Sequence, residues 1–115
     1  MLKYNLYISD IERAMVNIGN SIKGMSIESF SKNQDAIDSN SMRMQIIGES
    51  LKKIPLNLWG DYKNEIKSLI DFRNVISHAY FKINPLLLWD VLQNKIPQLK
   101  TELKKILKYT KEKNG

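Results

Sequence analysis

The sequence predicts an all-α protein: a four-helix bundle whose helices run up and down and are joined by short loops. Apolar residues recur at spacings of three and four, which is typical of the buried face of a helix. Only three prolines and five glycines interrupt the 115 residues. Since a hydrophobic fraction of 43% is enough for one core, we expect a single domain over residues 1–115.

An apolar stripe and a capping residue predict the first two helical segments. A long helix is expected over about residues 6–23, and Gly24 ends it. Its stripe consists of Ile8, Ile11, Met15, Ile18 and Ile22. Residues 26–30 are predicted as a short extra helical turn, with Ser26 as the N-cap and Phe30 inserted into the core.

The second and third long helices are separated by a predicted loop over residues 56–62. The second helix is expected over about residues 33–54, where Pro55 stops it. Its buried side consists of Ala36, Ile37, Met44, Ile47 and Leu51. The third helix is expected to start near Asp61 and to reach Ala79.

The last helix has the clearest start signal in the chain. Asn84 is a capping residue and Pro85 suits the first helical turn, so we expect a long helix over about residues 85–110. Pro97 lies inside this helix and removes one backbone donor. It therefore predicts a kink.

The third predicted helix carries the candidate catalytic residues. Its predicted core face consists of Ile66, Leu69, Phe72, Val75, Ile76 and Ala79. Asp71, Asn74 and His78 share a second stripe, whereas Arg73, Ser77 and Tyr80 lie nearer the opposite border of the core. Arg73 and His78 are about 140° apart on an ideal helix. Either Arg73 reaches round, or the helix distorts, or two chains of a symmetric dimer pool their residues in one cleft.

These residue types suit cleavage of RNA without a metal ion. A histidine can take the proton of the 2′-hydroxyl, and a guanidinium can clamp the charge that gathers on the phosphate in the transition state. Asn74 would fix the imidazole tautomer or bind a phosphate oxygen. However, Arg-X4-His is a short pattern. An exposed, non-catalytic His78 beside an Arg73–Asp71 ion pair would account for the same residue pattern.

Charge and composition narrow the classes of partner and site. The net charge of +6 favours a polyanionic partner, although much of it is a C-terminal run that also fits a solvated helix face. That run consists of Lys100, Lys104, Lys105, Lys108, Lys111 and Lys113. Zero cysteines exclude disulfides and thiolate catalysis, and a single histidine excludes a conventional multi-histidine zinc site within one chain. We therefore expect no metal and no cofactor.

The sequence shows no apolar run of the roughly 18 residues that a membrane span requires. Its first residues lack the apolar core of a secretory signal. We expect a cytoplasmic protein that has no membrane partner.

The segment Arg73-Asn74-X3-His78-X-Tyr80 resembles the Arg-X4-6-His motif of HEPN domains, in the form found in HepT ribonuclease toxins. The similarity extends along most of the chain. Residues 44–50 (MQIIGES) resemble that family's IIGEA segment, and Phe30 followed by residues 35–37 resembles its F…DA pattern. Residues 89–91 and 96–99 resemble its W.V…lP.L ending.

The resemblance implies a specific fold, activity and partner. HepT-like proteins are helical homodimers that cleave RNA without metal, with the two motifs facing one cleft. Arg73 and His78 would be catalytic, and Asn74 would support them. Tyr80 would be modified with AMP by a nucleotidyltransferase antitoxin, which would add bulk and negative charge beside the cleft.

Three further side chains are predicted to have structural or supporting roles. They are Glu49, Asp71 and Ser77. Glu49 would pair with Arg73 or Arg43, or remain a surface charge.

Two other functions stay open from the sequence. One is a non-catalytic helical dimer that binds a nucleotidyltransferase and a nucleotide or other polyanion. The other is a structural bundle whose basic tail binds nucleic acid. Trp59 and Trp89 are interpreted as core or dimer contacts rather than as platforms for base stacking.

Overall fold

A computed structural model describes the backbone of residues 2–79 and 83–114. Within these ranges every regular element is helical, which confirms the predicted all-α class. Along the chain, the elements are η1 (Leu2–Tyr4), α1 (Asn5–Ile22), α2 (Ile27–Ser31), α3 (Gln34–Lys52), η2 (Leu56–Tyr62), α4 (Lys63–Ala79), α5 (Pro85–Asp90), η3 (Val91–Lys95) and α6 (Ile96–Asn114).

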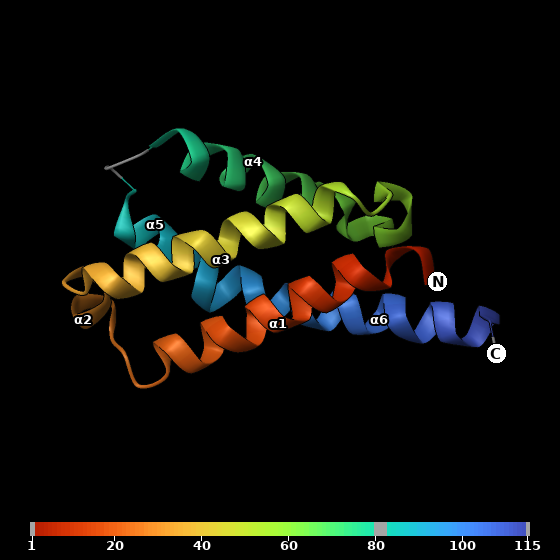
Figure 1. Ribbon diagram of the computed structural model, residues 1–115, viewed down its shortest axis with the longest axis horizontal. Coiled ribbons are helices and arrows are strands. Elements are labelled where there is room, and N and C mark those ends of the chain that lie inside the picture. The colour runs from red at the N-terminus through yellow and green to blue at the C-terminus, as the bar shows by residue number, and fades with distance from the viewer. Residues whose placement is uncertain (1, 80–82, 115) are drawn as a thin grey trace.

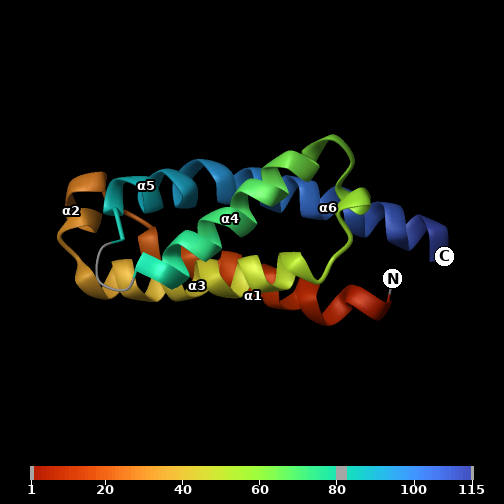
Figure 2. The same cartoon turned by 90° about the horizontal axis from the view of Figure 1, so that it is seen from above.

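The long helices form an elongated bundle in which sequential neighbours run in opposite directions (Figure 1). α3 packs against α1 on one side and against α4 on the other. In the turned view α4 crosses obliquely, with its C-terminal part over α3 and its N-terminal part near α6 (Figure 2). α3 is therefore the helix whose surface positions α4.

Polar side chains cap the helices where the sequence predicts starts. The Ser26 hydroxyl accepts a hydrogen bond from the Ser29 amide at 3.0 Å, and the Ser29 hydroxyl accepts one from the Ser26 amide at 3.0 Å. Asn84 accepts one from the Leu86 amide at 2.9 Å. Such caps satisfy amide groups that have no partner within the helix. Both predicted capping residues are therefore confirmed.

The predicted apolar stripes of α1 and α3 are buried, as is Phe30 in the short helix α2. On α4, Ile66, Leu69 and Ile76 are buried as predicted. Val75 is an exception, because its side chain is 58% exposed. It lies about 200° round the helix from Arg73, which faces α3, so it turns away from the bundle. The Ala79 side chain lies outside the described residues.

The segment predicted as a loop between the second and third helices is the 3-10 segment η2. Gly60 interrupts it with a left-handed φ of 57°, and α4 starts at Lys63, slightly later than expected. Trp59 is buried, and its ring lies 6.3 Å from that of Tyr62. Burial raises the pKa of Tyr62 to about 12, and the nearby Glu65 and Glu102 add to the shift. Trp59 is thus a core residue, as interpreted from the sequence.

Just before Pro97, where the sequence predicts a kink, the structure has a π-helical segment, η3. The Ile96 amide donates to the Val91 carbonyl, five residues back. Pro97 has no amide proton, and its ring clashes with the carbonyl four residues earlier. The wider π-helical turn moves that carbonyl away and so relieves the clash. Helical backbone continues through η3 from α5 into α6.

The first lysines of the C-terminal run lie on the outside of α6. Lys100, Lys104 and Lys105 are exposed, as predicted for a solvated helix face. The side chains of Lys108, Lys111 and Lys113 lie outside the described residues. No helix in the described part of the chain has both the length and the apolar character needed to cross a membrane.

Candidate functional site

Arg73 sits on a glycine where α4 crosses α3. Gly48 is buried, and a Cβ added there would lie 2.5 Å from the Arg73 Cγ. Neither atom has room to move far, because both belong to the base of a side chain on a packed helix. Only glycine at position 48 therefore lets the Arg73 stem lie flat against α3.

Two polar neighbours hold the Arg73 guanidinium. Its Nη2 forms an ion pair with Glu49, the residue after Gly48, and its Nη1 donates to the Asn74 Oδ1 at 3.2 Å. The Arg73 side chain is only 22% exposed. A partly buried, doubly held guanidinium has few alternative positions, so its remaining donor surface is preorganised.

The structure decides among the partners that the sequence left open for Glu49. Glu49 pairs with Arg73, whereas Arg43 donates to the Asn40 Oδ1 at 3.0 Å. Asp71 is exposed and forms no ion pair with Arg73. The alternative of an Arg73–Asp71 pair is therefore wrong.

A hollow opens beside the guanidinium on the outer face of α1 and α3. Its volume is about 360 Å³. It is lined by Tyr7, Asp10, Gln45, Ile46, Glu49, Ser50, Lys53 and Arg73. Charges of both signs line it, namely the cations of Arg73 and Lys53 and the carboxylates of Asp10 and Glu49. An anion entering the hollow would meet a guanidinium that is already paired with Glu49.

His78 lies apart from this cluster. Its side chain is exposed and makes no hydrogen bond or ion pair with any residue that the structure describes. Ser77, its neighbour, points back to α3, where its hydroxyl donates to the Gln45 Oε1 at 3.4 Å. Arg73 and Ser77 thus face α3, and His78 faces outward. Tyr80, the predicted site of modification, lies outside the described residues.

Sequence reasoning missed the two α3 residues that seat the motif helix. Gly48 receives Arg73, and Gln45 receives Ser77. The sequence offered one signal, the glycine at position 48 inside a predicted helix. Glycine there lowers helix stability by about 1 kcal/mol relative to alanine, so its presence indicates a packing requirement.

Comparisons with known proteins point to one family. A family model described as "Ribonuclease HepT-like" matches residues 7–106. "Putative RNase MJ0125" from Methanocaldococcus jannaschii is 35% identical over 109 residues, which cover 93% of each chain. "Probable ribonuclease HepT" from Thermococcus cleftensis is 29% identical over 107 residues, which cover 89% of this chain and 94% of that protein. No solved structure gives a significant match.

The seat of Arg73 predicts different effects of alanine at two helical glycines. Gly48→Ala forces α4 away from α3, and we expect it to lower the free energy of unfolding by about 1–3 kcal/mol. Gly19→Ala is the control, because nothing lies within 4 Å of its added Cβ. It should raise that free energy by up to about 1 kcal/mol. Urea unfolding followed by circular dichroism measures both, and equal stabilities would contradict the close contact.

Proposed function

The chain belongs to the family of HepT-like ribonucleases, and on that premise we propose that it is a toxin-type endoribonuclease that cleaves cytoplasmic RNA without a metal ion. We propose further that residues 1–115 form one domain of this kind. The observation that carries the proposal is the seating of Arg73. A guanidinium held by Glu49 and Asn74, on the helix that displays His78, is a preorganised phosphate ligand.

In the proposed reaction the 2′-oxygen of a ribose attacks the adjacent phosphorus, and the bond to the 5′-oxygen of the next nucleotide breaks. One proton leaves the 2′-hydroxyl and one reaches the departing oxygen, so the step needs a base and an acid. His78 carries one of these proton transfers. Arg73 neutralises the non-bridging oxygens, and Asn74 keeps the guanidinium in place through its 3.2 Å hydrogen bond.

Two protomers would complete the site. Arg73 faces α3 while His78 faces outward, so one helix does not bring them together. α3 and α4 also carry exposed apolar side chains, namely Met42, Ile46 and Val75, at 59%, 41% and 58% exposure. A two-fold dimer that covers these side chains would present Arg73 of one protomer to His78 of the other.

The proposed activity is tested on purified protein with labelled RNA in excess EDTA. We expect cleavage by the unaltered protein, and a loss of at least about 100-fold in Arg73→Ala and His78→Ala, because each removes a group that acts in the transition state. Ser68→Ala, an exposed change on the same helix, is the control. Undiminished cleavage by both site variants, with folding intact, would refute the assignment.

The composite cleft predicts rescue between two inactive subunits. In a dimer of one Arg73→Ala and one His78→Ala protomer, one of the two shared sites keeps both residues. Such heterodimers, isolated with two different affinity tags, should recover about half of the unaltered activity. If Arg73 and His78 of the same protomer work together, the heterodimer stays inactive.

We also propose that a nucleotidyltransferase antitoxin controls this site by transferring AMP to Tyr80. The position is two residues after His78, so an AMP group there would add negative charge beside the RNA site. It would repel the phosphate backbone as well as block access.

Intact mass spectrometry after co-expression with a nucleotidyltransferase antitoxin tests this control. We expect mass increments of AMP, their absence in Tyr80→Phe, and their retention in the control Tyr4→Phe. Increments that persist in Tyr80→Phe would place the modification elsewhere.

One observation favours a second candidate function, a non-catalytic dimer that binds the nucleotidyltransferase and a polyanion. Glu49 already neutralises Arg73, as it would in a site that only docks a partner. This candidate predicts a stable complex with the nucleotidyltransferase and no RNA cleavage under any condition.

A further inference from the structure

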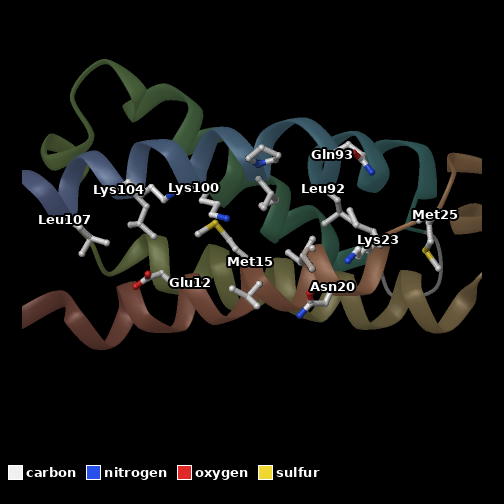
Figure 3. Close-up of a pocket in the computed structure, with 18 residues that line it drawn as sticks. Glu12, Met15, Asn20, Lys23, Met25, Leu92, Gln93, Lys100, Lys104 and Leu107 are labelled. Atoms are coloured by element: carbon white, nitrogen blue, oxygen red, sulfur yellow. The ribbon is translucent and has the colours of Figure 1, made fainter.

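A long groove runs between α1 on one side and η3 and α6 on the other (Figure 3). Its volume is about 650 Å³, and it shares no lining residue with the hollow beside Arg73. Buried apolar side chains form its floor, chiefly Met15, Ile18, Leu92, Ile96 and Leu103. Two of them belong to or border the π-helical segment η3, a distortion that is frequent at functional sites.

Lysines dominate the rim of the groove. Lys23 lies toward one end, near Leu92 and Gln93, while Lys100 and Lys104 lie toward the other (Figure 3). None of the three lysines forms an ion pair with a described residue. Glu12 is the one acidic side chain among the lining residues. The rim therefore offers positive charge at both ends of an apolar trough.

Gly19 leaves one position on the wall of this groove without a side chain. It lies inside α1, lines the groove, and is exposed, with nothing within 4 Å of an added Cβ. Glycine inside a helix costs about 1 kcal/mol relative to alanine. Gly48 is explained by Arg73, but no contact within the described chain explains Gly19. A surface that must let another backbone approach closely would explain it.

We propose that the groove binds an acidic amphipathic helix of a partner protein. The backbone from Glu12 in α1 to Lys23, which directly follows α1, is about 17 Å long, as is the facing stretch of α6, which suits a helix of roughly 12 residues. Apolar side chains at i, i+4 and i+7 would fill the floor, and carboxylates would meet the lysines at both ends. Gly19 would allow the partner backbone to lie close to α1.

Other occupants fit less well. A fatty carboxylate has one charged end, whereas the lysines lie at both ends of the groove. RNA would meet a floor whose lining residues include no aromatic ring for base stacking. A second copy would bring a chain of net charge +6 to a lysine rim. The proposal rests on the groove alone and is independent of the ribonuclease assignment.

A designed peptide tests the proposal with the full-length protein. The probe is a fluorescein-labelled helix of about 14 residues with leucines at i, i+4, i+7 and i+11 and glutamates on its polar face. We expect saturable binding by fluorescence anisotropy, and no binding of the same composition scrambled. Gly19→Leu, which fills the trough, should weaken binding at least about tenfold, as should the double change Lys100→Glu and Lys104→Glu.

Matched controls separate the groove from general effects. Asn17→Leu is exposed on the same helix but outside the groove, and Lys63→Glu with Lys67→Glu repeats the charge change at the same spacing on α4. Both should bind like the unaltered protein, and Gly19→Leu should keep any RNA cleavage. Equal binding of the scrambled peptide, unchanged binding by Gly19→Leu, or equal displacement by an RNA oligonucleotide would each overturn the proposal.

Discussion

The close approach of α4 to α3 at Gly48 is the constraint on which the candidate site depends. It sets where the Arg73 stem lies, and the next residue, Glu49, then meets the guanidinium. Withdrawing a charge from water costs free energy unless it is paired and hydrogen-bonded, and Glu49 and Asn74 supply these partners. The guanidinium that we propose as the phosphate-binding group is thus held in place within the folded chain, with Glu49 already paired to it.

The same contact explains why His78 stands apart. Once Arg73 and Ser77 face α3 and Ile76 faces the core, the helical repeat turns His78 and Val75 outward. An exposed valine beside an exposed histidine on a surface helix is poorly explained within one chain. In the proposed dimer, a second protomer would cover Val75 and His78 and bring Arg73 and His78 of different protomers together.

Two glycines in neighbouring helices show how one residue type can serve different ends. Gly48 is required by an internal contact, and Gly19 has none. Local preference is the same at both positions, since glycine disfavours a helix wherever it occurs. Only the residues packed around each glycine distinguish Gly48, which makes room for Arg73, from Gly19, which leaves the groove open for the proposed partner helix. The bundle therefore presents two separate surfaces, one on each face of α1.

The sequence by itself determined the helices, their caps and most of their buried faces, because these depend on periodicity and on residues such as Ser26, Asn84 and Pro55. It also located the Arg73–His78 motif. Tertiary packing decided the rest. Whether Glu49 paired with Arg73 or Arg43, whether Val75 was buried, and how the helix adjusted before Pro97 all depended on the distance and angle between helices. Periodicity along one chain does not contain that information, because a helical wheel gives the direction of a side chain and not what lies there.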